Sequence, residues 1–378
     1  DITSSLAQAT DFASQALNAQ VQRQQQLVLR FSDYNREQQL RLTQLCQQLD
    51  GVVQASPEQL TVLLNQTAGR QLTHQWSRVF TDQATTQIQL TQIMKQYDVF
   101  WQAGEHRFNL TKKPMIYGIM NITPDSFFDG GQYKTKDDVL NHVDAMLQAG
   151  ADVIEVNGQT TRPGFTEVTP QVELDRTLPY IRAIKARFPE AVLAVDTYKY
   201  DVMQAVLEEG VSIINDVNAF TDDPRKLKLM ADSRVGLLTM HSSRDQEYTD
   251  LTSSMRGFFE QNLAALTSHG IDIERIALDQ GIGYSQVAHG EKDYVMMRNI
   301  DEFNYLRRPM MVAISRKGYL GLLLGLKKED RLPMTLVTEA AMMLKGGRII
   351  RVHDVAETKQ LITLLGRIEN GYWLSNND

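Results

Sequence analysis

Three stretches of the chain decide its fold class. They read Met115-Ile-Tyr-Gly-Ile-Met120, Asp152-Val-Ile-Glu-Val156 and Val192-Leu-Ala-Val195, short apolar runs that are each followed by a helical pattern. Five similar runs follow at residues 212–214, 235–240, 276–278, 310–314 and 348–350, and the eight starts lie 20 to 41 residues apart. This spacing is typical of a strand plus a crossover helix, so we expect an α/β fold, a (β/α)8 TIM barrel. A doubly wound open sheet is the alternative, but a Gly-x-Gly-x-x-Gly turn after the first run is missing.

The composition is that of an ordinary globular protein. Of 378 residues, 42% are hydrophobic and 22% are charged, and the net charge is −7. This chain lacks the dense basic surface needed to bind nucleic acid or an anionic membrane. The sequence contains no apolar run of about 18 residues, so no membrane-spanning helix is expected. Cys46 is the single cysteine, which excludes an intrachain disulfide and a zinc cluster built on cysteines. We therefore expect a cytoplasmic protein.

The first 110 residues differ from the rest. Residues 1–113 hold 23 glutamines and one proline, a composition that favours helices. We expect a helix over residues 4–49, a break near residues 51–57 and further helices, forming an all-α bundle-like accessory domain over residues 1–110 before the barrel over 111–378. Its apolar stripes are weak, which predicts self-association or a protein partner. The glutamine- and alanine-rich run over 8–101, with Ser56-Pro-Glu-Gln-Leu60, resembles phasins, helical coat proteins of polyester granules.

Each of the eight apolar runs is followed by polar residues. They are Asn121, Asn157, Asp196, Asn215 with Asp216, His241, Asp279, Ser315 to Lys317, and Arg351 with His353. In a TIM barrel the carboxyl ends of the strands share one face, and that face carries the active site. One such residue is usually a turn or cap residue, whereas a full rim of them predicts a single functional site.

The rim contains two chemically distinct subsets. The first combines two carboxylates, an amide and an ammonium: Asp196, Asp279, Asn215 and Lys317. These groups suit the amino-pyrimidinone edge of a flat heterocycle. The second is cationic and suits phosphate oxygens: Arg162, Arg351 and His353. Across from it, Asn121 offers an oxygen of the kind that binds Mg²⁺. The alternative is a hydrolase with Asp196 and Asp279 as acid and base, which has no use for an anion clamp.

Several motifs of the second part occur in a family-specific order. They are Gly118-Ile-Met-Asn-Ile-Thr-Pro-Asp-Ser-Phe127, Asp129-Gly-Gly131, Gly158-Gln-Thr-Thr-Arg-Pro-Gly164, Val195-Asp-Thr-Tyr-Lys199, Ile214-Asn-Asp-Val217, Ser315-Arg-Lys317 and Arg351-Val-His-Asp354. Over residues 115–366 the chain resembles dihydropteroate synthase. This family is a homodimeric TIM barrel that joins 6-hydroxymethyl-7,8-dihydropterin diphosphate to 4-aminobenzoate and releases diphosphate.

The resemblance implies a role for each rim residue. Asp196, Asn215, Asp279 and Lys317 would hold the pterin, and Thr161, Arg162, Arg351 and His353 would hold the diphosphate. Ser315 would lie near the aminobenzoate carboxylate, and Asn121 would help to bind Mg²⁺. The catalytic set would be Asp196, Asp279, Lys317 and Arg351. The mechanism needs no protein nucleophile.

Five positions depart from the family pattern, and one of them is Met334, where a glycine is expected before Thr335. Glu155 and Asn157 stand where Asp and Gly are expected, and Gln280 and Gln286 stand where Pro and Lys are usual. These departures leave a second hypothesis open, a pterin-binding or scaffold paralogue with altered activity whose helical domain mediates assembly. A third is a methyltransferase acting on methyl-tetrahydrofolate, which shares the pterin pocket but needs no diphosphate clamp.

Overall fold

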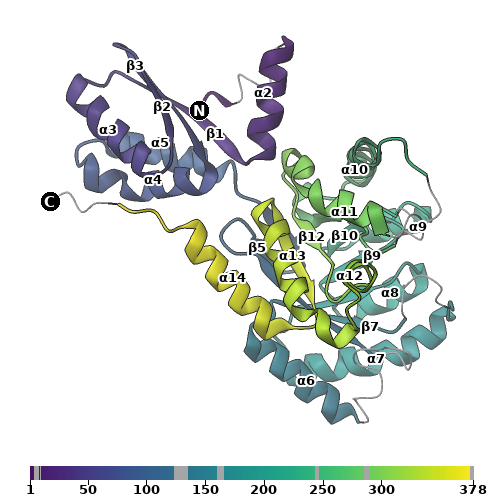
Figure 1. Ribbon diagram of the computed structural model, residues 1–378. Helices are drawn as coiled ribbons and strands as arrows, with labels where there is room; N and C mark the ends of the chain where they lie inside the picture. Colours follow the sequence, from purple (N-terminus) through teal and green to yellow (C-terminus); the bar gives the residue numbers. More distant parts are fainter. Residues whose placement is uncertain are drawn as a thin grey trace. The chain divides into compact units, whose positions relative to one another are not determined.

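The computed structural model describes residues 1–3, 8, 10–122, 135–159, 166–242, 247–284 and 290–374 (Figure 1). The chain divides into two compact units. Unit 1 comprises Asp1–Asp98, Asp301–Arg307 and Leu364–Asp378, and unit 2 comprises Val99–Ile300 and Arg308–Thr363. Within the described ranges, no helix is long and apolar enough to cross a membrane.

Unit 2 is built on eight parallel strands. They are β6 (Met115–Asn121), β7 (Val153–Asn157), β8 (Leu193–Asp196), β9 (Ile213–Asp216), β10 (Gly236–Met240), β11 (Ile276–Asp279), β12 (Met310–Val312) and β13 (Gly347–Val352). Each pairs with the next, and β13 pairs with β6, which closes the barrel. Strands β7 to β11 are buried along their whole length, as expected when helices cover a parallel barrel. The (β/α)8 prediction is confirmed, and the open-sheet alternative is wrong.

Helices follow the strands around the outside of the barrel (Figure 1). They are α6 (Lys136–Ala149), α7 (Pro170–Arg187), α8 (Tyr200–Glu208), α9 (Pro224–Asp232), α10 (Leu251–Ser268), α11 (Glu291–Arg298), α12 (Tyr319–Leu324), α13 (Leu332–Leu344) and α14 (Val355–Glu369), with 3-10 turns η1 (Ile273–Arg275), η3 (Ile300–Leu306) and η4 (Lys328–Arg331). Local sequence marks where they begin. Thr169 caps α7 by accepting a hydrogen bond from the Val172 amide, and Pro170 occupies the first turn.

A hairpin of β4 (Phe100–Ala103) and β5 (His106–Asn109) packs with the residues that begin the barrel strands. Trp101 is fully buried there, and its indole Nε1 donates to the Arg275 carbonyl at 3.0 Å. Gly236 makes room for the hairpin, because a Cβ at this position would lie 2.9 Å from the Cβ of Ala103. The hairpin therefore belongs to the barrel core, although it precedes residue 111. The domain boundary at 110 and 111 stays a prediction.

Unit 1 combines helices with a small sheet. The helices are α2 (Phe12–Arg23), α3 (Arg36–Gln48), α4 (Gln66–Val79) and α5 (Ala84–Lys95), and the strands are β1 (Gln26–Ser32), β2 (Val52–Ala55) and β3 (Gln59–Asn65). The sheet is antiparallel in the order β1-β3-β2. In its core, alternate residues of the strands pack against the helices. Trp76 of α4 stacks on both Phe31 and Phe80.

The expectation of helix throughout this region was wrong for β1, β2 and β3. Leu27, Leu29 and Phe31 alternate with less buried residues, and Leu60, Val62 and Leu64 do the same. A period of two is the strand signal, and it outweighed the helix-favouring composition. Ser56 lies in the turn between β2 and β3, where its hydroxyl accepts a hydrogen bond from the Gln59 amide at 3.2 Å. The likeness to phasins, which are helical proteins, stays a prediction.

Candidate active site

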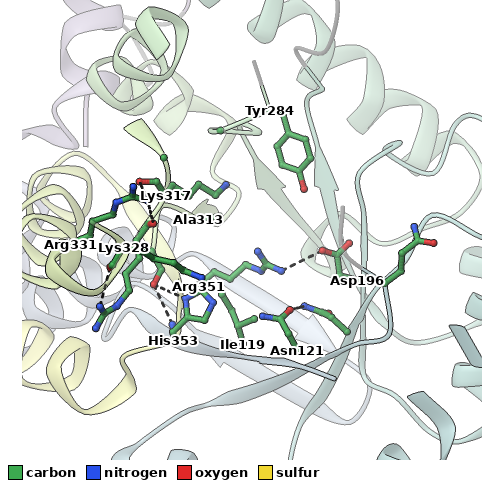
Figure 2. Close-up of a pocket in the computed structure, with 16 residues that line it drawn as sticks. Ile119, Asn121, Asp196, Tyr284, Ala313, Lys317, Lys328, Arg331, Arg351 and His353 are labelled. Atoms are coloured by element: carbon green, nitrogen blue, oxygen red, sulfur yellow. Dashed lines mark hydrogen bonds and ion pairs between the residues drawn. The ribbon is translucent and has the colours of Figure 1, made fainter. Parts of the chain in front are cut away.

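A cavity of about 420 Å³ opens at the carboxyl ends of the barrel strands (Figure 2). Six of the residues for which the resemblance implies a role line it, from β6, β8, β13 and the segments that follow β12 and β13: Asn121, Asp196, Ser315, Lys317, Arg351 and His353. Residues separated by 232 positions, from 121 to 353, therefore meet in one site. Thr161, Arg162 and Gln286 lie outside the described residues.

Asn215 and Asp279 are not among the residues that line the cavity, but both are buried at the ends of barrel strands. Asn215 of β9 pairs in register with Asp196 of β8, so the two side chains come from neighbouring strand ends. Asp279 ends β11, is buried, and accepts a hydrogen bond from the Gly281 amide at 2.9 Å. Its carboxylate and the Lys317 ammonium act on each other electrostatically. The barrel thus brings together the ends of the strands that carry the four groups predicted to bind a heterocycle: Asp196, Asn215, Asp279 and Lys317.

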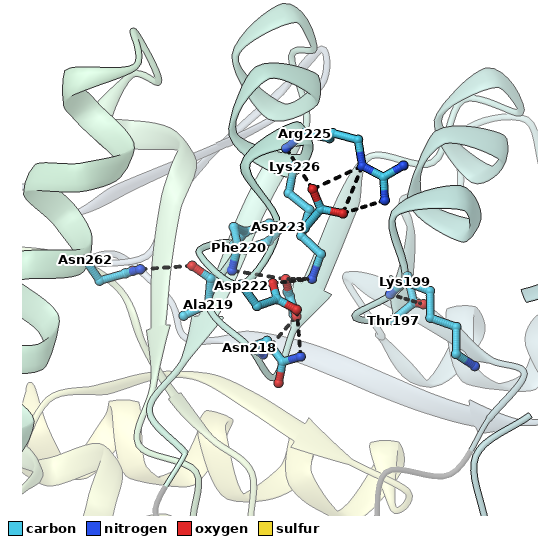
Figure 3. A network of polar contacts seen from close by, with 11 residues as sticks. Thr197, Lys199, Asn218, Ala219, Phe220, Asp222, Asp223, Arg225, Lys226 and Asn262 are labelled. Carbon is cyan, nitrogen blue, oxygen red and sulfur yellow. Dashed lines mark hydrogen bonds and ion pairs between the residues drawn. The ribbon is translucent and has the colours of Figure 1, made fainter.

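The turn after β9 is held by the buried carboxylate of Asp216. This carboxylate accepts from the Phe220 amide at 3.0 Å and from the Lys226 ammonium at 2.9 Å (Figure 3). Ala219 and Phe220 have φ angles of 58° and 62°, in the left-handed region that favours glycine. The Asp216 contacts stabilise this strained turn, which directly follows Asn215.

Two acceptor atoms at the ends of β8 and β9 are buried without a described donor. Oδ1 of Asp196 and Oδ1 of Asn215 are enclosed, and no described residue donates a hydrogen bond to either atom. Buried polar atoms are normally paired, so both atoms have unused capacity to accept hydrogen bonds. The two atoms stand on adjacent strands and fit a ligand edge with neighbouring N–H groups.

Burial shifts the titration of the inner groups toward their neutral forms. Burial, aided by the negative charge of Glu155, raises the pKa of Asp196 to about 8. Burial also lowers the pKa of Lys317 to about 8, although Asp279 opposes that change. Burial raises the pKa of Asp279, against the opposing charge of Lys317. Strongly perturbed groups gathered in a cleft are typical of functional sites.

Arg351 connects the site to Glu155, a residue for which no sequence motif indicated a role. Its Nε lies 3.0 Å from Oε1 of Glu155, its Nη2 also pairs with that carboxylate, and Nη2 lies 3.3 Å from Oδ2 of Asp196. Burial alone would lower the pKa of Arg351, but Glu155 and Asp196 together raise it. The signal for Glu155 was present in the sequence, as one charged residue inside an apolar strand run.

The outer end of the cavity is organised by the segment after β12. Ser315 Oγ and Nδ1 of His353 lie 3.0 Å apart, which joins this segment to the end of β13. Arg316 also lines the cavity, and its guanidinium is paired with Asp354 through two 2.8 Å contacts. Arg331 of η4 donates to the carbonyl of Arg316 at 3.1 Å and thereby braces the turn. No sequence motif marked Arg331, because its role depends on where η4 packs.

Comparisons with known proteins agree with this geometry. A family model described as pterin binding enzyme matches residues 117–353. The dihydropteroate synthase of Streptococcus pyogenes is 34% identical over 264 residues, covering 69% of this chain and 98% of the relative. The chain belongs to the dihydropteroate synthase family. The Bacillus subtilis dihydropteroate synthase is 33% identical over 259 residues, covering 68% and 90% of the two chains.

Solved dihydropteroate synthases share the barrel. The Yersinia pestis enzyme with a sulfonamide drug superposes with a TM-score of 0.66 at 31% identity, covering 71% of this chain and 98% of its own. The Xanthomonas albilineans enzyme with 4-aminobenzoic acid has a TM-score of 0.66 at 31% identity, covering 72% and 98%. The chain is accordingly a transferase of folate biosynthesis.

One departure from the family pattern has a structural role outside the cavity. Gln280 is fully buried, and its Nε2 donates to the Met296 carbonyl of α11 at 2.9 Å. A proline there would offer no such donor. The substitution therefore links the end of β11 to α11.

Proposed function

We propose that this dihydropteroate synthase binds 6-hydroxymethyl-7,8-dihydropterin diphosphate with its ring at the inner end of the cavity. Oδ1 of Asp196 and Oδ1 of Asn215 would accept the ring N–H and amino donors, and these orphaned acceptors are the observation that carries the proposal. Asp279 would accept a further ring donor, and Lys317 would donate to the ring carbonyl or a ring nitrogen.

The diphosphate is assigned to the cationic side of the cavity. Arg351 and His353 line that side, and Thr161 and Arg162 are proposed to join them on the strength of the sequence motif. Charge-assisted contacts stabilise the diphosphate most strongly as it departs, because negative charge then accumulates on it. The carbon–oxygen bond to the pterin methylene breaks, and the electron pair leaves with the diphosphate.

Mg²⁺ is the cofactor that fits this side of the site. Asn121 lines the cavity, and Oδ1 of the neighbouring Asn157 is buried without a described donor, so amide oxygens of the kind Mg²⁺ accepts are present. The described residues hold no cluster of three or more His, Cys, Asp or Glu side chains that could bind a metal, so most ligands would be diphosphate oxygens and water. When bound, Mg²⁺ would neutralise charge on the leaving group.

The second substrate is 4-aminobenzoate, placed at the outer end. Its carboxylate would lie near Ser315, whose hydroxyl faces His353. Its neutral amine attacks the pterin methylene carbon, forms the carbon–nitrogen bond and then loses one proton to the solvent. The residues of this chain orient the two substrates, and none of them has to act as a nucleophile.

The setting of the enzyme is also proposed. We infer a cytoplasmic homodimer, as the family resemblance implies, with residues 1–110 as an accessory domain that self-associates or binds a protein partner. Sedimentation of the full chain would test the dimer, with a single monomeric species as the contradicting result.

Turnover measurement tests the assignment. With pterin diphosphate, Mg²⁺ and 4-aminobenzoate, the full chain should release dihydropteroate and diphosphate in equal amounts. Lys317→Ala and Asp196→Asn should each lower kcat/KM by about 100-fold or more while the fold persists. Lys228→Ala, a solvent-exposed lysine of α9, serves as the control.

Two outcomes would contradict the proposal. Full activity in both site variants would remove the pterin-pocket assignment. Pterin binding without product formation by the full chain would favour the scaffold paralogue, and methyl transfer from methyl-tetrahydrofolate would favour the methyltransferase.

A further inference from the structure

The interior of the barrel contains a carboxylate that the proposed reaction does not use. Glu155 lies in the middle of β7 and is completely buried. A buried carboxylate requires a partner, and here the partner is the Arg351 guanidinium. Glu155 occupies a position where the family pattern has the shorter Asp.

The pairing uses only one side of the guanidinium. Nε and Nη2 of Arg351 face Glu155, and Nη2 also lies 3.3 Å from Asp196. No described residue accepts a hydrogen bond from Nη1, although Arg351 lines the cavity. Contacts on one side fix the plane of the Arg351 guanidinium, and its Nη1 can still donate hydrogen bonds to an anion.

Asn157 extends this arrangement to the edge of the cavity. It lies two residues after Glu155 on β7, so both side chains are on the same face of the strand. Its Nδ2 donates to Oε1 of Glu155 at 2.8 Å and to Oδ1 of Asn121 at 3.3 Å. The family pattern has glycine at position 157, which could make neither contact. The two departures on β7 therefore contact each other.

We propose that Glu155 and Asn157 form a coupled pair of positioning residues that fixes Arg351 for the departing diphosphate. The longer Glu155 carboxylate reaches the guanidinium, and the Asn157 amide holds that carboxylate and links it to Asn121. The pair keeps Arg351 oriented before substrate arrives, so no reorganisation is needed as the leaving group gains charge. This inference rests on the proposed function, because it concerns the same leaving group.

A double-mutant cycle on the full chain tests the coupling. The variants are Glu155→Asp, Asn157→Gly, and the double variant that restores the family pair. Calorimetry would measure the affinity for inorganic diphosphate without Mg²⁺, so that a lost metal ligand at Asn157 does not contribute, and separately for 6-hydroxymethylpterin. Each single variant should bind diphosphate about tenfold more weakly, and the double variant should lose no more than the weaker-binding single variant, because Asn157 acts through Glu155. Pterin affinity should stay unchanged throughout.

Further measurements separate positioning from a general loss of structure. Glu155→Gln keeps the size of the side chain and removes its charge, so it should lower kcat and diphosphate affinity without changing KM for 4-aminobenzoate. Glu339→Gln is the matched control, because Glu339 is also a buried glutamate but contacts Thr358 outside the cavity. Its thermal midpoint shows how much a buried glutamate contributes to the fold alone, and its diphosphate affinity should not change.

The contradicting results are distinct from failure of the proposed function. Strictly additive losses in the double variant would overturn the coupling. Tighter diphosphate binding by Glu155→Gln would show that Glu155 competes with the leaving group instead of positioning Arg351. Either result leaves turnover by the unaltered chain intact, whereas absence of turnover would contradict the function itself.

Discussion

The Asp196 carboxyl group contacts Arg351, has one buried oxygen without a described donor, and has a raised pKa. One oxygen contacts Arg351, and the other is buried without a described donor. Burial, followed by the charge of Glu155, raises the pKa of Asp196 to about 8, so the ligand-free carboxyl is mostly protonated at pH 7. A ring that donates N–H groups to this carboxyl favours its ionised form, because the carboxylate is the stronger acceptor. Ligand binding and proton release are therefore linked at this residue.

Pterin binding at pH 7 should release close to one proton from Asp196. Binding lowers a raised pKa toward its ordinary value, so the release should be largest between the pKa values of the bound and the free carboxyl and should vanish above both. Calorimetry in two buffers with different ionisation enthalpies measures the number of protons. Asp196→Asn is the control, since an amide has no proton to lose. Equal binding enthalpies in both buffers would contradict this account.

The barrel strands could be predicted from sequence patterns, whereas the strands of the first 110 residues were missed. The barrel strands were recognisable because both faces of a covered parallel strand are apolar, which produces continuous runs such as Met115 to Met120. Strands β1 and β3 were missed because glutamine-rich composition favours helix, while the alternation of Leu60, Val62 and Leu64 was given too little weight. The β4–β5 hairpin was missed because nothing in its four-residue strands indicates that Trp101 packs with the barrel core.

Trp101→Ala should destabilise the barrel strongly. The substitution removes a fully buried indole and leaves a cavity, and changes of this kind cost about 3 to 5 kcal/mol. Denaturant unfolding of the full chain, followed by circular dichroism, measures the loss. Trp373→Ala is the matched control, because Trp373 is 86% exposed and should matter little. Coincident unfolding curves for the two variants would refute the structural role given to the hairpin.

At the scale of the whole molecule, the units are not simple consecutive segments. Unit 1 includes residues 301–307 and 364–378 in addition to the first 98 residues. Arg23 of α2 pairs with Asp301 at 2.8 Å and also contacts Glu302, and Gln71 of α4 contacts Asn370 at 3.1 Å. Removing the N-terminal region would therefore leave these later segments without their partners.

Truncated chains should rank in stability by the contacts they lose. A chain starting at Val99 keeps Trp101 but loses the Arg23 contacts, whereas a chain starting at Thr111 loses both. Thermal midpoints should fall from the full chain to the Val99 start and then to the Thr111 start. Turnover by the Val99 start should persist, because all the described cavity residues lie within residues 119–353. A Thr111 start as stable as the Val99 start would contradict the importance of the hairpin.

The barrel, the polar residues that follow its strands and the family could all be predicted from sequence alone. Strand spacing and residue type are local properties that need no knowledge of the folded chain. The sequence brought Asp196, Lys317 and Arg351 to the same face through the geometry of parallel strands. The tertiary structure alone decided how these charges combine. Glu155 and Arg351 lie 196 positions apart, and only closure of the barrel between β13 and β6 brings their strands close enough for the ion pair. Charges act through space, so their pairing depends on distances that only the folded chain sets.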